Sequence, residues 1–394
     1  MDDQRSFDAW VDAASGGGAF ALDTEFHRER TYFARLALLQ LARRGDAGAD
    51  DVDIVVVDPL AVDVGPLRAL LDSDAPCIMH AASQDLEILE RACGCGPRVL
   101  VDTQVAAGFV GLGSPGLGVL LQRRLGVHLG KADRLTDWLQ RPLPDDALTY
   151  AALDVAHLHA LWASEEQELV ARGRVEWALD ECDELRRRHG EPFAAELAWW
   201  RIKEARRLKG RARGVAQSVA AWRETRARQL DRPVRHVLPD LAVMAIAERP
   251  PRSRGDLARV RGLDGRHLKN GAAEELMVAV KAGIDLPESE LFLPPRDGVD
   301  STFRPAVTLA SAWVSQLSRD ADLDASLVAT RADLESLVRG DGASRLLTGW
   351  RAEVAGDAVQ RLLEGTAALA FDGEGNLVLE ARSHRPPATD GADA

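Results

Sequence analysis

Short apolar runs alternate with amphipathic stretches along the first 180 residues of the chain. AFALDTEF, RLALLQLA and DIVVVDPL have the length and apolar content of strands, and PCIMH and RVLVDT are shorter runs of the same kind. Between them, LRALLDS and SQDLEILERA show the apolar spacing of helices. Strands that alternate with helices in this way predict an α/β domain in which helices cover a sheet.

The pattern changes after about residue 185, where strand-like runs almost vanish. Helical periods take over, and prolines separate several short helices. LPESELFLPPRDG over 286–298 is typical of a linker, and AALAF near the C-terminus is a further strand-like run. We therefore predict an α/β domain over 1–205, two small all-α domains over 210–288 and 298–375, and a disordered tail over 384–394.

The chain of 394 residues carries 49 Lys and Arg against 62 Asp and Glu, a formal net charge of −13. An acidic chain would argue against a nucleic-acid partner if its charge were evenly spread. It is not, because residues 186–281 hold 23 Lys and Arg against 11 Asp and Glu, a net charge of +12, and the rest carries −25. A solvated helical surface is one explanation, but the scarcity of compensating acids favours a face that contacts phosphates.

Simpler features exclude several other functions. No run of about 18 apolar residues occurs, so we expect no membrane span. The N-terminal MDDQRSFDAW lacks the apolar core of a secretory signal, and the four cysteines lack paired CxxC spacing, so we expect reduced thiols in a cytoplasmic protein. GLGSPGLG at 111–118 contains G-x-G-x-x-G, but a helical stretch precedes it and a proline interrupts it, so we expect no nucleotide cofactor.

Two acids interrupt the first apolar strand. Asp23 and Glu25 lie two residues apart, so the strand period places both side chains on one face. Neighbouring carboxylates repel each other and are tolerated best around a cation. Because the ligands are oxygen only, Mg²⁺ or Mn²⁺ is favoured over zinc. A D-x-E pair alone is a weak signal.

Two further acids have notable settings. Asp85 lies in the first turns of a helix after PCIMH, where an acid is also favoured simply by the positive helix N-terminus. Asp154 lies on a strong helical pattern, and Tyr150 precedes it by four residues, on the same helical face. Taken alone, Tyr150 could equally be a half-buried packing residue.

The order of these residues is more specific than any one of them. A strand D-x-E, a helical Asp about sixty residues on and a helical Y-x-x-x-D about seventy further resemble the DEDD exonuclease superfamily. Whole phrases are similar to its ribonuclease D family, over roughly residues 15–180: ALDTEFHRERTYFARLALLQLA, HAASQDLEIL and LTDWLQRPLPDDALTYAALDVAHL. Thr149 stands where one branch has a catalytic histidine, so the chain resembles the tyrosine branch.

The resemblance implies a ribonuclease-H-like fold, a mixed sheet flanked by helices. It also implies a two-metal 3′–5′ exoribonuclease that needs Mg²⁺, with Mn²⁺ as the alternative ion, and releases nucleoside 5′-monophosphates. Asp23, Glu25, Asp85 and Asp154 would be the metal ligands, and Tyr150 would orient the attacking water. Near them we select three candidate substrate-binding residues: Phe26, His80 and Gln84. His157 and His159 lie on the wrong side of Asp154 for catalysis, and we interpret both as helix-surface residues.

The segment from 214 to 283 resembles the helicase-and-RNase-D C-terminal (HRDC) domain, a small helical nucleic-acid-binding module, and coincides with the basic window. The segment from about 300 to 372 resembles a second, less typical copy. The expected partner is RNA with a 3′ extension, including tRNA precursors. A DNA-directed exonuclease of the same superfamily and a non-catalytic RNA-binding protein remain alternatives. The sequence leaves open the physiological RNA, the oligomeric state and whether the second helical domain contacts RNA.

Overall fold

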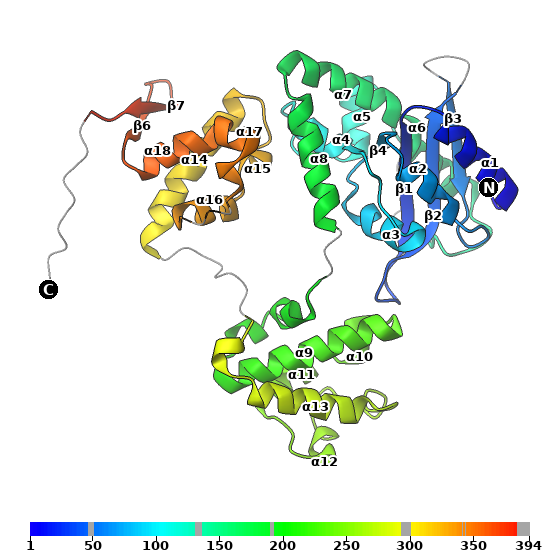
Figure 1. Ribbon diagram of the computed structural model, residues 1–394, viewed down its shortest axis with the longest axis vertical. Coiled ribbons are helices and arrows are strands. Elements are labelled where there is room, and N and C mark those ends of the chain that lie inside the picture. The colour runs from blue at the N-terminus through cyan, green and yellow to red at the C-terminus, as the bar shows by residue number, and fades with distance from the viewer. Residues whose placement is uncertain are drawn as a thin grey trace.

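The computed structural model describes residues 1–45, 51–130, 136–189, 193–292, 301–340, 342 and 344–383, and the predicted tail over 384–394 lies outside this part of the chain. The strands of the first domain are β1 (Phe20–His27), β2 (Arg35–Arg44), β3 (Val52–Val57), β4 (Cys77–Met79) and β5 (Leu100–Asp102). Within the described residues they form one mixed sheet in the order β3-β2-β1-β4-β5 (Figure 1). Strands β1 to β3 are antiparallel, and β4 and β5 continue parallel to β1. All five apolar runs predicted as strands are confirmed.

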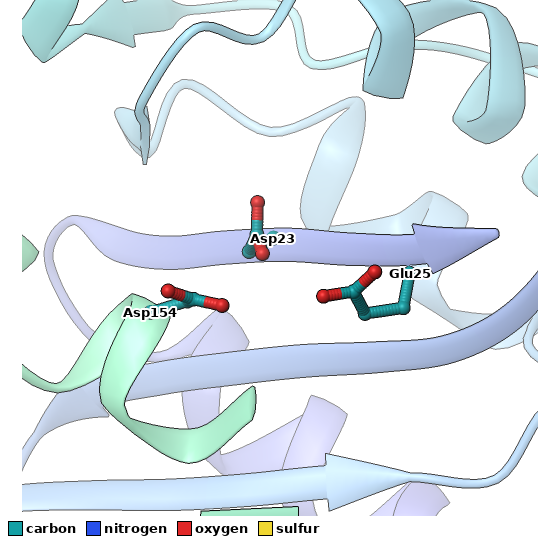
Figure 2. A group of neighbouring side chains, drawn as sticks. All are labelled: Asp23, Glu25 and Asp154. Carbon is teal, nitrogen blue, oxygen red and sulfur yellow. The ribbon is translucent and has the colours of Figure 1, made fainter. Parts of the chain in front are cut away.

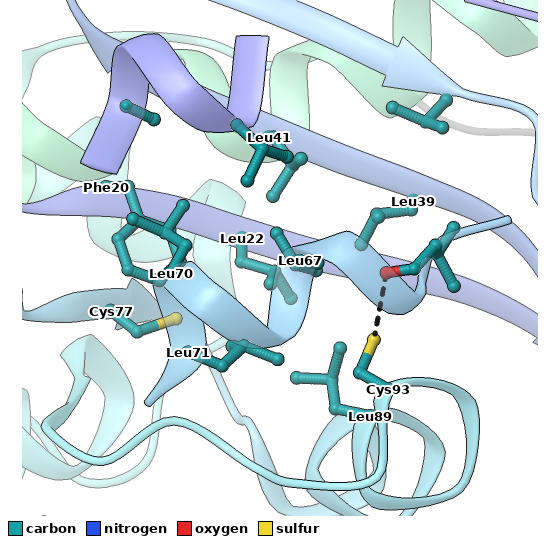
Figure 3. Close-up of a cluster of buried hydrophobic side chains, with 14 of the residues drawn as sticks. Phe20, Leu22, Leu39, Leu41, Leu67, Leu70, Leu71, Cys77, Leu89 and Cys93 are labelled. Carbon is teal, nitrogen blue, oxygen red and sulfur yellow. Dashed lines mark hydrogen bonds between the residues drawn. The ribbon is translucent and has the colours of Figure 1, made fainter. Parts of the chain in front are cut away.

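Helices cover both faces of this sheet. They are α1 (Gln4–Ser15), α2 (Arg68–Leu71), α3 (Ser83–Cys93), α4 (Thr103–Gly108), α5 (Leu117–Leu125), α6 (Asp145–Ala156) and α7 (Leu158–Arg172). One face of the sheet bears Phe20, Leu22 and Leu39, which pack with α1, α2 and α3 (Figure 3). The opposite face bears Ala21 and Ala42, which pack with α4 to α7. Because both faces are buried, the strands are almost continuously apolar, and the acids within β1 are exceptions.

The second domain is helical and begins earlier than the sequence suggested. Its helices are α9 (Gly210–Leu230), α10 (Val234–Val237), α11 (Asp240–Glu248), α12 (Arg254–Leu257) and α13 (Ala272–Asp285). Trp199, in a 3-10 turn over Ala195–Arg201, is fully buried in the core of these helices. This packing favours a domain boundary before residue 193 rather than near 205.

Helices α9 and α13 touch at two glycines. A Cβ added to Gly214 would lie 2.5 Å from the carbonyl oxygen of Gly283, and one added to Gly283 would lie 2.5 Å from the Cα of Val215. Only residues without a side chain allow the two backbones to approach this closely. The glycine pair therefore fixes the crossing around which the core of this domain is built.

The third domain packs directly on the first. Its elements are α14 (Arg304–Asp320), α15 (Ala325–Val328), α16 (Arg331–Val338), α17 (Gly349–Arg351), α18 (Asp357–Leu363), β6 (Ala367–Phe371) and β7 (Leu377–Ala381). Trp350 stacks on Trp177 of α8 (Val175–His189), with ring centroids 5.4 Å apart, and lies edge-on to Phe109 at 5.1 Å. A shared apolar core therefore joins the first and third domains.

Two local features differ from the sequence predictions. AALAF is strand β6, as predicted, but it pairs with a second strand, β7, that the sequence pattern did not reveal. The third domain is therefore helical with a β-hairpin at its C-terminal end. His159 of α7 is buried at 5% exposure and its Nε2 lies 3.2 Å from the carbonyl oxygen of Ala42, so the prediction of a surface histidine was wrong. No helix in the described ranges has both the length and the apolar content needed to cross a bilayer.

Candidate active site

Strand β1 presents the first two carboxylates. Asp23 pairs with Gln40 of β2 and Glu25 with Leu38, on the sheet face that α6 covers. A β-bulge follows at once, because Phe26 pairs with Leu36 and the register shifts. A β-bulge bends a strand and changes the direction of its side chains. The chain therefore changes course directly after Asp23 and Glu25.

Helix α6 brings the third carboxylate over the sheet. Asp145 and Asp146 in its first turn suit the positive helix N-terminus. Ala147, Ala151 and Val155 form its buried side, and small residues there let the helix lie close to the strands. Asp154 borders this side.

The three carboxylates meet in one place. Asp23, Glu25 and Asp154 each offer an oxygen, and these three oxygens lie within 4.8 Å of one another (Figure 2). Oxygen-only ligands at this spacing suit a hard divalent cation such as Mg²⁺ or Mn²⁺. The predicted pairing of the strand D-x-E with the distant helical Asp is thus present in the fold.

Asp85 lies beside this cluster on α3. It is 7% exposed and accepts a hydrogen bond from the Thr24 hydroxyl. The preceding turn is fixed by Asp102, whose carboxylate accepts from the backbone N–H groups of Ala81 (3.0 Å) and Ala82 (2.8 Å). Thr24 was not predicted as a site residue, although strand alternation places it on the face opposite Asp23 and Glu25, toward α3. The described residues thus place Asp85 next to, but not within, the three-carboxylate group.

Burial and mutual repulsion raise the pKa values of all four acids. Burial is the largest cause in each case: it raises the pKa of Glu25 to about 8, of Asp154 to about 7 and of Asp85 to about 6. The pKa of Asp23 is raised well above its usual value by burial and then by the charges of Asp85, Asp154 and Glu25. Such a cluster is stable in its ionised form only with positive charge between the carboxylates, so the residues fit divalent cations.

Tyr150 lies beside the carboxylates with a protonated phenol. Burial and then the charge of Asp154 raise the pKa of its phenol, so it stays protonated at neutral pH. It lies one helical turn before Asp154, and its ring centroid is 6.4 Å from that of Trp138. A fixed, neutral O–H beside the carboxylates can orient a water or a phosphate oxygen.

The three predicted substrate-binding residues have different settings. Phe26 is half-buried at the end of β1, directly after the acid pair. Gln84 is exposed in the first turn of α3. His80 turns toward the protein, with its Nδ1 2.9 Å from the Thr103 hydroxyl oxygen, so it is held within the fold on the side of α4.

The loop between β1 and β2 contacts the basic helical domain (Figure 1). The Tyr32 hydroxyl donates to Glu224 of α9 at 2.7 Å, and the Phe33 N–H donates to Asp231 at 3.0 Å. A cavity of about 810 Å³ opens at this junction, lined by arginines from both domains together with aromatic residues and the glutamates Glu87, Glu90 and Glu224. These arginines are Arg28, Arg188, Arg201 and Arg228.

Comparison with known proteins gives a consistent result. A 3′-5′ exonuclease family model matches residues 1–169, and an HRDC domain model matches residues 212–279. The chain is 36% identical over 364 residues to ribonuclease D of Jannaschia sp., covering 91% of this chain and 93% of the relative. It is 33% identical over 357 residues to ribonuclease D of Escherichia coli, covering 88% and 93%.

A solved structure extends the likeness to the fold. The crystal structure of Escherichia coli RNase D, described as an exoribonuclease involved in structured RNA processing, superposes with a TM-score of 0.80 at 31% identity. The superposition covers 93% of this chain and 98% of that one. The similarity therefore includes the helical domains as well as the α/β domain.

Proposed function

The chain belongs to the ribonuclease D family of 3′–5′ exoribonucleases, and from that premise we propose that Asp23, Glu25, Asp85 and Asp154 form its catalytic centre with two divalent cations, Mg²⁺ or Mn²⁺. The observation that carries this proposal is the meeting of three carboxylate oxygens from β1 and α6 within 4.8 Å, with Asp85 beside them. When bound, the ions supply charge neutralisation at the phosphate and activation of the attacking water.

We assign each of the site residues a separate role. Asp23, Glu25 and Asp154 would hold one ion, and Asp23 with Asp85 would hold the other. Thr24 fixes Asp85 by its hydroxyl hydrogen bond, and Tyr150 donates its O–H to orient the attacking water while keeping its proton. Phe26, at the end of β1, is placed to stack on or wedge beside the terminal base. We assign weaker roles to His80, which is held by Thr103, and to the exposed Gln84.

We further propose that RNA reaches this centre across the domain junction. Arg28 follows Glu25 by three residues, so the cavity at the domain junction lies at the same end of β1 as the carboxylates. Beyond it lies the basic helical domain, where the excess of arginine suits a phosphate backbone. The substrate is an RNA with a single-stranded 3′ extension, and a tRNA precursor has this form.

A direct test is incubation of the full-length protein with a 3′-extended RNA, with Mg²⁺ and with EDTA. We expect nucleoside 5′-monophosphates to be released one at a time with Mg²⁺ and none with EDTA. A DNA strand of the same sequence tests the alternative DNA-directed activity, since faster release from DNA would favour it. Binding of RNA without any release, in Mg²⁺ and in Mn²⁺, would support a non-catalytic RNA-binding protein instead.

A further inference from the structure

A buried amide lies directly across the sheet from Asp23. Gln40 of β2 is 0% exposed, and it is the cross-strand partner of Asp23 in the antiparallel pair. Facing residues in such a pair have Cβ atoms roughly 5 Å apart and point to the same face of the sheet. The side chain of Gln40 therefore lies beside the carboxylate that we assign to both ions.

The amide of Gln40 has no hydrogen-bond partner among the described residues. Neither its oxygen nor its nitrogen is bonded, although both atoms are shielded from solvent. An unpaired polar group in an apolar interior destabilises a fold, and a hydrophobic side chain of similar shape would avoid that cost. A glutamine at this position is thus locally unfavourable, which is the kind of conflict expected where function constrains a residue.

The surroundings of Gln40 leave few groups that it can bond. Its neighbours on the same strand face are Leu38 and Ala42, and its partner on β3 is Val56. Ala151 of α6 packs in the same cluster as Leu38, and Val155 packs in that of Ala42, so this turn of the helix passes over Gln40. These neighbours carry apolar side chains. Polar side chains near it include the Asp23 carboxylate, directly across the strand pair, and His159, whose Nε2 lies 3.2 Å from the carbonyl oxygen of Ala42.

We propose that Gln40 is a positioning residue whose Nε2–H donates to the Asp23 carboxylate when the ions are bound. A neutral donor suits this place, because it forms a charge-assisted hydrogen bond to an ionised carboxylate without adding to the repulsion between the acids. The bond would fix which Asp23 oxygens face the two ions. This inference rests on the proposed function, since it assumes that Asp23 binds the ions.

The test compares Gln40→Met with a matched control, Gln217→Met. Methionine has a similar length and no strong hydrogen-bonding group. Gln217 is also buried, at 6% exposure, but its amide oxygen accepts from the Phe292 N–H at 2.9 Å and lies in the helical domain. Two quantities are measured: the melting temperature of the metal-free protein in EDTA, and the Kd for Mn²⁺ by calorimetry.

We expect the two variants to differ in both the melting temperature and the Kd for Mn²⁺. Gln40→Met should melt at or above the wild-type temperature without metal and bind Mn²⁺ about 10-fold to 100-fold more weakly, the usual effect of removing a group that orients a metal ligand. Gln217→Met should melt lower and bind Mn²⁺ as the wild type does. In RNA hydrolysis, Gln40→Met should lower kcat at limiting Mn²⁺, recover at saturating Mn²⁺ and keep the wild-type KM for RNA.

Other outcomes would overturn the proposal. An unchanged Kd for Mn²⁺, or a metal-free melting temperature that falls as in Gln217→Met, would mean that Gln40 is bonded for structural reasons only. A crystal structure of the wild-type protein with Mn²⁺ gives a measurement that needs no variant: Nε2 more than about 4 Å from both Asp23 oxygens would exclude the bond. Failure of the wild-type protein to bind Mn²⁺ at all would instead count against the proposed function.

Discussion

Replacement of Glu25 by glutamine should make the metal-free protein more stable at alkaline pH while removing its activity. The side chain keeps its shape, but one of the clustered acids can no longer ionise. In the wild type, burial and the charges of Asp154 and Asp85 raise the pKa of Glu25 from 4.5 to about 8. The folded protein therefore binds a proton that the unfolded chain releases above pH 4.5.

The sign of the effect follows from this difference. Because the pKa is higher in the folded state, the contribution of Glu25 to stability is fully present below pH 4.5 and is lost as the pH rises through about 8. The loss amounts to at most about 5 kcal/mol for the change in pKa. The Glu25→Gln variant has no such loss, because an amide does not ionise. In a domain of this size the difference in melting temperature at pH 8.5 should reach roughly 10 °C.

The assay is differential scanning calorimetry in EDTA between about pH 5 and pH 8.5, a range that spans the loss. We expect the melting temperature of the wild type to fall with pH more steeply than that of Glu25→Gln, and we expect Mn²⁺ at the alkaline end to stabilise the wild type more than the variant. Glu248→Gln, at an exposed position of α11 in the helical domain, controls for the same chemical change away from the cluster. Parallel melting curves for wild type and Glu25→Gln across this range would refute the reasoning.

Four further outcomes are expected. Asp23→Ala should abolish nucleotide release in an exonuclease assay but leave RNA binding nearly intact; full activity would contradict the metal assignment. Tyr150→Phe should lower kcat roughly 100-fold with little change in KM, as for loss of one preorganised donor. Trp350→Ala should destabilise the protein by about 3–5 kcal/mol in urea unfolding, because Trp350 fills the core shared by the first and third domains. RNA affinity should fall steeply as the salt concentration rises, and a flat salt response would exclude a phosphate-binding role for the basic domain. If Arg201 contacts one phosphate, Arg201→Gln should reduce the slope of log Kd against log salt by about 1.

The sequence allowed four of the candidate site residues to be selected from local relations along the chain. Asp23 and Glu25 interrupt a strand that is otherwise buried on both faces, and Tyr150 and Asp154 share one face of a helix. These are short-range relations, which the periods of strand and helix fix without knowledge of the fold. The proposal of their joint role came from order and spacing along the chain, through resemblance to a family.

Other features depended on contacts between distant segments. The burial of His159 follows from the packing of α7 on β2, and the hairpin partner of β6 had too little periodicity to be recognised. The stacking of Trp350 on Trp177 joins residues far apart in the chain, so the attachment of the third domain to the first was not predictable from pattern. The sequence around Gln40 did not indicate that this residue faces Asp23, because the pairing of β1 with β2 sets the cross-strand register.

The sequence by itself therefore determined the class of the first domain, the basic character of the second and the residues able to bind cations. These properties depend on local periodicity, composition and side-chain chemistry. Only the tertiary structure decided that three carboxylates from β1 and α6 converge within 4.8 Å, and that Gln40 lies beside them without a partner among the described residues. Their raised pKa values arise from the same convergence, because burial and repulsion act only on groups that the fold has brought together.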